Sequence, residues 1–181
     1  MTRTPVPRLA PVTGSSVYTG IGDGIVTLDR PTGLKVVEFE CAECSRVTAI
    51  TTDGDEAVLV RTVGPYRGKR WLNVHDGART TTLTITANAA WTVGVGGLEA
   101  ATESSGSLSG TGDSVVVYRG TATTARITNS GDGAFVVDVV SGPAGLGLPV
   151  DTVGAYDGTV PLEGPAIIQV TSNGTWTVTP R

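Results

Sequence analysis

Two cysteines, Cys41 and Cys44, are separated by two residues, a spacing typical of zinc sites and of thiol–disulfide redox sites. A zinc site needs four ligands, and the chain has no second cysteine pair and a single histidine. A redox site needs the pair at the start of a helix in a βα unit, which this sequence does not predict. We therefore expect either two thiols or a local disulfide at a turn.

The single histidine, His75, is predicted to lie in a turn at the end of a strand. Nucleophilic catalysis needs a serine or cysteine held beside such a base, and no nucleophile motif accompanies it. Asp-Gly pairs such as Asp53-Gly54 lack the spacing of a calcium-binding loop, and aspartate favours turns through its own side chain. The sequence predicts no catalytic residues, no metal site and no cofactor, so we expect a protein that is not an enzyme.

One basic cluster has aromatic neighbours and is a candidate partner-binding surface. Its residues are Tyr66, Arg67, Lys69, Arg70 and Trp71. Arginine and aromatic residues are enriched at the centres of protein interfaces, and positive charge attracts phosphate groups. A solvated loop, a protein contact and a nucleic-acid contact all fit this pattern. The nucleic acid is the least favoured, because the chain has a net charge of −4.

The composition predicts that strands position these residues. The 181 residues include 28 Thr, 25 Val and 25 Gly. Thr and Val are branched at Cβ and favour strands, whereas Gly marks turns. Because 39% of the chain is hydrophobic and only 17% is charged, we expect a folded protein. No apolar run reaches the roughly 18 residues of a membrane span, and the N-terminus has no secretory signal pattern.

Three blocks of sequence occur twice in the same order and predict an internal duplication. They are residues 20–26 with 110–116, residues 62–68 with 152–158, and residues 83–93 with 168–178. The matching positions include Gly, Tyr, Asn and Trp residues. The copies differ at the basic cluster, because Asp157 takes the place of Arg67 and the other basic residues are missing.

Turn residues and alternation divide each copy into about seven short strands, a number typical of a small sandwich or barrel. The predicted fold class is all-β, with two tandem, homologous antiparallel β-sandwich (Ig-like or small barrel) modules. The predicted divisions are an extended N-terminal arm over residues 1–19, a first module over 20–95, a linker over 96–109 and a second module over 110–181. The first strands are expected at 25–28 and 115–118, with one helical turn at 98–103.

The repeated blocks resemble a β-sandwich module that recurs in actinobacterial and actinophage proteins. Its pattern is Gly-x-Gly-Asp, an aliphatic strand, a (Val/Ile)-Gly-x-Tyr-x-Gly turn and a closing Asn/Asp-Gly-x-Trp-Thr-(Val/Ile) hairpin. The resemblance covers most of residues 20–95 and 110–181 and implies binding or structural modules, with no catalytic residues to carry over. Because this chain lacks a signal peptide, lipobox or anchor, the resemblance favours a phage virion protein.

The N-terminal arm is the second candidate for partner binding. Its residues Arg3, Pro5, Pro7 and Arg8 belong to a stretch without periodicity, which we expect to lie along a neighbouring subunit. The leading hypothesis is a non-enzymatic structural protein of a large assembly. Most specifically, we expect a phage capsid decoration protein that docks through this arm and stabilises the shell, and next a tail component. The expected partners are major capsid or tail subunits and further copies of the chain, with no membrane. The expected location is the virion, after synthesis in the bacterial cytoplasm.

The alternative hypothesis is a carbohydrate- or cell-surface-binding β-sandwich module of a tail or adhesion protein. In that case Tyr66, Trp71 or Tyr156 would stack on a sugar ring. A solvent-accessible Trp71 would favour this alternative, whereas buried aromatic residues would favour the assembly. Trp91 and Trp176 fall at matching places in the two copies and are expected in the core.

Overall fold

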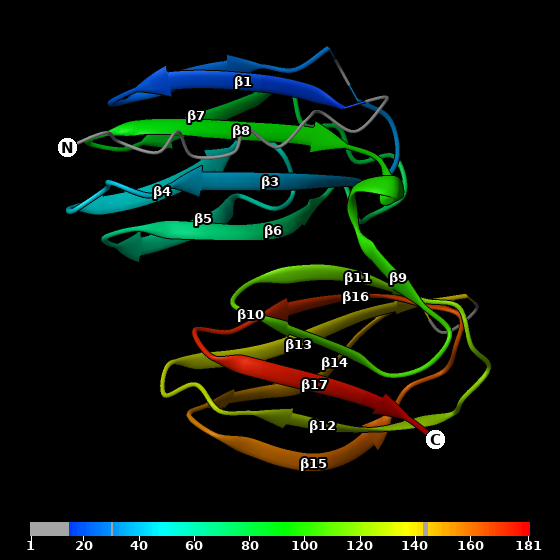
Figure 1. Cartoon of the computed structure of the whole chain (residues 1–181). Helices are drawn as coiled ribbons and strands as arrows, with labels where there is room; N and C mark the ends of the chain where they lie inside the picture. The colour runs from blue at the N-terminus through cyan, green and yellow to red at the C-terminus, as the bar shows by residue number, and fades with distance from the viewer. Residues whose placement is uncertain (1–14, 30, 143–144) are drawn as a thin grey trace, which may run out of the picture.

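The computed structural model describes residues 15–29, 31–142 and 145–181, and it is built from strands. Figure 1 shows two pairs of sheets, one above the other. We call the pair formed by β1 to β8 the first half and the pair formed by β9 to β17 the second half. The all-β prediction is confirmed. Within the described ranges, no helix is long and apolar enough to cross a membrane.

The first half contains two sheets. Sheet I has the order β1-β8-β3-β6, with strands β1 (Ser16–Ile21), β8 (Ala90–Gly96), β3 (Lys35–Cys41) and β6 (Tyr66–Leu72). Sheet II has the order β2-β7-β4-β5, with strands β2 (Gly24–Thr27), β7 (Thr82–Thr86), β4 (Val47–Thr52) and β5 (Val58–Val63). All pairs within these sheets are antiparallel.

The second half also contains two sheets. Sheet III has the order β10-β17-β12-β15, with strands β10 (Leu108–Thr111), β17 (Thr175–Pro180), β12 (Thr124–Asn129) and β15 (Tyr156–Pro161). Sheet IV has the order β14-β13-β16-β11-β9, with strands β14 (Gly145–Val153), β13 (Ala134–Ser141), β16 (Ala166–Thr171), β11 (Ser114–Tyr118) and β9 (Thr102–Ser104). When β1 to β8 are matched with β10 to β17, sheets I and III have the same strand order, and so do sheets II and IV, apart from the added β9.

Each half has its own hydrophobic core between its two sheets. Alternation along β3 places Val37, Phe39 and Cys41 in the first core, as a strand with one buried face requires. Trp91 and Trp176 are buried in the two cores, as the sequence predicted. The Trp91 Nε1–H donates to the Gly22 carbonyl at 2.8 Å, and the Trp176 Nε1–H donates to the Gly112 carbonyl at 2.9 Å. Each buried indole therefore has a partner for its single donor.

The first strand of each half begins earlier than the sequence indicated. Strands β1 and β10 precede the predicted first strands, so the arm assigned to residues 1–19 overlaps β1 from Ser16 onwards. β1 is an edge strand held by main-chain pairing with β8, and its residues are mostly exposed. Such a strand has no apolar alternation that a sequence pattern could reveal. Residues 1–14 lie outside the described residues.

The predicted linker over residues 96–109 contains regular structure. The helical turn expected at 98–103 is shorter, a 3-10 helix η1 (Leu98–Ala100), and Thr102–Ser104 form β9. β9 pairs in parallel with β11 and so adds a strand from the predicted linker to the otherwise antiparallel sheet IV. A three-residue strand paired through its backbone needs no apolar pattern, which is why a Gly- and Ser-rich composition concealed it.

Candidate functional site

The predicted partner-binding cluster lies on β6, the edge strand of sheet I that faces the second half (Figure 1). Of the alternatives left open, the solvated loop does not describe this segment, because Tyr66–Leu72 form a strand paired with β3. The structure brings Tyr66, Lys69, Arg70 and Trp71 into contact with residues beyond the first half, whereas Arg67 is exposed. We call this contact the junction. The arm candidates Arg3, Pro5, Pro7 and Arg8 lie outside the described residues.

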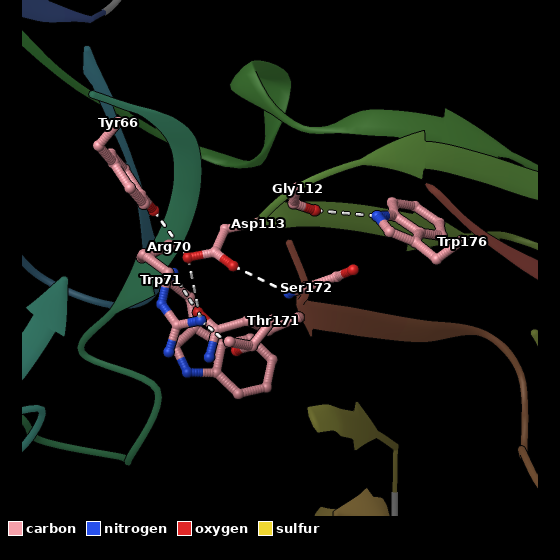
Figure 2. Close-up of polar contacts among 9 residues, drawn as sticks. Tyr66, Arg70, Trp71, Gly112, Asp113, Thr171, Ser172 and Trp176 are labelled. Carbon is pink, nitrogen blue, oxygen red and sulfur yellow. Dashed lines mark hydrogen bonds and ion pairs between the residues drawn. The ribbon is translucent and has the colours of Figure 1, made fainter. Parts of the chain in front are cut away.

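Asp113 is the centre of the junction (Figure 2). The Tyr66 hydroxyl donates to Asp113 Oδ2 at 2.8 Å, and the Arg70 guanidinium forms an ion pair with the same oxygen at 3.8 Å. Arg70 also donates to the Thr171 hydroxyl on β16. Asp113 belongs to the turn before β11, so a carboxylate of the second half accepts a hydrogen bond from one side chain of the first half and forms an ion pair with another.

Main-chain groups of β6 reinforce this contact. The Lys69 N–H donates to the Asp113 carbonyl at 3.0 Å, and the Trp71 N–H donates to Gln169 Oε1 at 2.8 Å. Gly68 lies so close to Asp113 that an added Cβ would come within 2.9 Å of the Asp113 Cβ. A glycine at this position therefore lets the two backbones approach each other.

The other carboxylate oxygen of Asp113 belongs to the second half alone. Asp113 Oδ1 accepts from the Ser172 N–H at 3.0 Å (Figure 2). In the first half, Asp23 Oδ1 accepts from the Ala87 N–H at 3.1 Å in the matching turn. The repeated Gly-Asp sequence therefore has the same local role in both halves, and only Asp113 has an additional role at the junction.

An apolar cluster lies beside these polar contacts. Its buried members are Trp71, Val36 and Val115, and Trp71 has an exposed fraction of only 5%. Partly buried residues pack around them, namely Leu34, Val74, Leu98, Ala100, Ala101, Val140 and Ile167. The cluster includes η1 and the outer face of sheet IV, so the segment between the halves is part of the contact. The Lys69 ammonium donates to the Ala100 carbonyl at 2.6 Å and fixes the same segment.

Burial changes the ionisation of groups at the junction. It raises the pKa of Tyr66, and the negative charge of Asp113 raises it further, so this hydroxyl stays protonated and donates. Burial also raises the pKa of Asp138, although a hydrogen bond from Gln169 and the charge of Arg70 oppose that shift. The Arg70 Nε is buried without a hydrogen-bond partner among the described residues.

Sequence reasoning missed Asp113 and Gln169, which complete the junction. Gln169 is a buried polar residue in the middle of β16, and nothing in its local pattern distinguishes it. The difference between the copies was the available signal. Aromatic and basic residues present in one copy of a repeat and missing in the other, at Arg70 and Trp71, are expected where one copy contacts its neighbour.

The other predicted positions behave as turns. Cys41 and Cys44 form a disulfide with a Cα–Cα distance of 5.5 Å and are buried in the first core, which selects one of the two alternatives left open. His75 is exposed. The Asp53 carboxylate accepts from Thr81 and Thr82 across its turn, and the Thr81 hydroxyl is the main cause of its lowered pKa. Across the described ranges, no group of three potential ligands could hold a metal.

No protein-family model matches the chain, and no curated protein matches it. Among solved structures, it is similar to a conserved protein of unknown function from Pseudomonas aeruginosa PAO1, with 11% identity and a TM-score of 0.28. That match covers 92% of this chain and 78% of the other.

Proposed function

We propose that the protein is a non-enzymatic structural protein of a large assembly. The observation that carries this proposal is the outer face of sheet II, which presents large apolar side chains to solvent. Ile25 and Val63 are more than two-thirds exposed, at 71% and 74%, and Val58 is 52% exposed. Apolar residues gathered on one exposed sheet face mark an interaction surface.

The registers of sheet II place these residues on one face. Ile25 is opposite Thr84, Thr84 is opposite Thr51, and Thr51 is opposite Val58, so the four form one row across the sheet. Val47 and Val63 form a further row. In sheet IV, the matching face is partly covered by the first half through Val115, Val140 and Ile167. The same kind of face therefore packs against a neighbour in the second half and is open in the first.

In its most specific form, the proposed role is a phage capsid decoration protein, with a tail protein as the next candidate. The arm with Arg3 and Arg8 and the face of sheet II would contact neighbouring shell subunits. The junction supports this role because it fixes two sandwiches together, which suits a protein that reinforces a shell. We do not propose the sugar-binding alternative, because Trp71 is buried and Tyr66 is held in the junction by Asp113, which leaves Tyr156 alone of the three predicted stacking residues.

The test is the number of copies in particles isolated from the native source. Sedimented particles would be analysed by mass spectrometry, with this chain measured against the major shell protein. On the order of hundreds of copies per particle fits a decoration protein, because closed symmetric shells repeat each subunit contact many times. A handful of copies would indicate the tail, and absence from the particles would overturn the virion role.

A further inference from the structure

The chain contains a second copy of both sides of the junction, and neither copy is occupied within the described residues. The donor side at the junction is the edge strand β6, and its counterpart is the edge strand β15. The acceptor side is the turn at Asp113 with β11 and β16, and its counterpart is the turn at Asp23 with β2 and β7. The two unoccupied sides belong to opposite halves of the chain.

Strand β15 keeps part of the donor side of the junction. It has the tyrosine, the glycine and the outward main-chain N–H of β6, but no counterpart of the Arg70 and Trp71 side chains. Tyr156 packs on Phe135 with a ring-centroid distance of 5.8 Å, as Tyr66 packs on Phe39 at 5.7 Å. The Tyr156 hydroxyl has no hydrogen-bond partner among the described residues. An added Cβ at Gly158 would come within 2.4 Å of that hydroxyl, as one at Gly68 would come within 2.6 Å of the Tyr66 hydroxyl, so both glycines make room for the tyrosine of their own strand. By the same register, the Thr159 N–H points away from β12, as the Lys69 N–H points away from β3.

The acceptor side is retained around Asp23. Asp23 Oδ1 is occupied by the Ala87 N–H, but its Oδ2 has no partner within the described residues. Ile25 is 71% exposed, whereas its counterpart Val115 is 1% exposed because it is covered by Trp71. The first half therefore presents an acceptor turn next to an uncovered apolar residue.

The two unoccupied sides differ from the junction in a complementary way: one has lost a hydrogen-bond donor, and the other has lost the acceptor for it. At the junction, the Trp71 N–H donates to Gln169. On β15 the matching residue is Pro161, which has no N–H, and on β7 the residue that matches Gln169 is Thr84. Arg70 is replaced by Val160, which is buried in the second core, so the ion pair is lost. A contact between these sides would keep the tyrosine–aspartate bond and lose most of the apolar cluster.

We propose that copies of this chain associate head to tail, with β15 of one copy docked on Asp23, Ile25 and β7 of the next. The contact is heterologous, so it extends to a third copy and beyond unless a ring closes. It is weaker than the junction because the ion pair, Trp71 and the covalent connection are missing. This inference rests on the proposed structural role, because it says how copies of the chain would contact each other in an assembly. It is measured on the isolated protein, so its failure and a failure of the copy-number test are distinguishable.

Sedimentation velocity of the full chain, from about 10 μM to about 1 mM, tests the proposal. We expect the average mass to rise with concentration past that of a dimer. Tyr156→Phe removes only the hydroxyl and should weaken association about tenfold, the equivalent of one hydrogen bond to a charged group. Ile25→Glu should abolish association. A monomer at every concentration would overturn the proposal.

Val63→Glu is the matched control on the same sheet face. Its counterpart in the second half, Val153, is 76% exposed and so lies outside the junction. We therefore expect Val63→Glu to associate like the natural chain. If it is as disruptive as Ile25→Glu, or if association stops at a dimer, the contact is a symmetric packing of two sheet II faces and the head-to-tail proposal is wrong.

Discussion

Tyr66 and Tyr156 occupy matching positions with different hydrogen bonding. The Tyr66 hydroxyl donates to Asp113, and the Tyr156 hydroxyl has no partner among the described residues. We expect Tyr66→Phe to lower the free energy of unfolding by about 1–2 kcal/mol, because it leaves a partly buried carboxylate with one donor fewer. Tyr156→Phe should change it by less than about 0.5 kcal/mol. Urea unfolding of both variants at low protein concentration measures the difference, and equal losses would contradict the role of the junction bond.

Asp138 gives the protein a pH dependence of opposite sign to that of a salt-bridged carboxylate. Burial raises its pKa in the folded state, so the folded chain binds this proton more tightly than the unfolded chain. Its favourable contribution is complete below the unfolded pKa and is lost as the pH rises through the folded pKa. We therefore expect Asp138→Asn to be more stable than the natural chain at pH 7.

The gain should stay below about 1 kcal/mol, because Asp138 is only partly buried and solvent screens its charge. Urea midpoints at pH 7 and near pH 3.5 provide the comparison, since the difference should disappear where the natural carboxyl is protonated. A natural chain that is more stable than the variant at pH 7 would show that the hydrogen bond from Gln169 and the charge of Arg70 outweigh burial.

At the scale of elements, β1 is the first strand of the described part of the chain. The Ser16–Ile21 strand pairs with β8 along its whole length. Deleting residues 1–14 keeps every main-chain pair of β1, so we expect the free energy of unfolding to fall less than in a deletion that removes this strand. Deleting residues 1–21 should lower it by a few kcal/mol, because about one kcal/mol is lost for each main-chain hydrogen bond. Chemical unfolding of both truncations tests this division, and a large loss for the shorter deletion would show that the arm belongs to the fold.

The same two truncations sharpen the test of docking. A deletion of residues 1–19 would remove most of β1 along with the arm, so a loss of binding would have two explanations. The truncation that ends at Gly14 removes the arm candidates and keeps every residue of β1. If the arm docks on a shell subunit, this truncation should stay folded and lose its place on the particle.

Most strands could be predicted because one face of each is buried. Alternation along β3 revealed its buried face. The hairpin expected at the Asn173-Gly174 turn is wrong, because β16 belongs to sheet IV and β17 to sheet III, so the turn connects two sheets. An Asn-Gly pair favours a tight turn but does not decide whether the flanking strands pair with each other. The strands β1 and β9 could not be found, because backbone pairing at a sheet edge holds them and their side chains are largely exposed. Sequence patterns report buried faces and do not report edges.

The residues of the candidate site on β6 could be predicted from the sequence, but the residues that they contact could not. The cluster from Tyr66 to Trp71 was recognised by its residue types, but its partners Asp113 and Gln169 are distant in sequence. Their roles depend on how one half meets the other, which no local pattern contains. Arg67, by contrast, belongs to the same cluster and is exposed, so residue type alone did not separate the contacting residues from the solvated one.

At the scale of the whole molecule, the junction should make the two halves unfold together. Two cores joined by buried polar and apolar contacts form one cooperative unit when the contact is strong relative to each half. We expect one calorimetric transition for the natural chain and two for Trp71→Ala, which removes about 3–5 kcal/mol of packing. Arg67→Ala, on the same strand but exposed, should keep one transition. Two transitions in the natural chain would show that the halves are independent.

The three tryptophans of the chain divide evenly among its three apolar clusters. Trp91 lies in the first core, Trp176 in the second and Trp71 at the junction. In a chain with Trp91→Phe and Trp176→Phe, all indole fluorescence would come from Trp71. A red shift of its emission, with the circular dichroism of the strands unchanged, would report separation of the halves before either unfolds. Natural placement of its aromatic residues thus gives this protein an optical reporter for each of its parts.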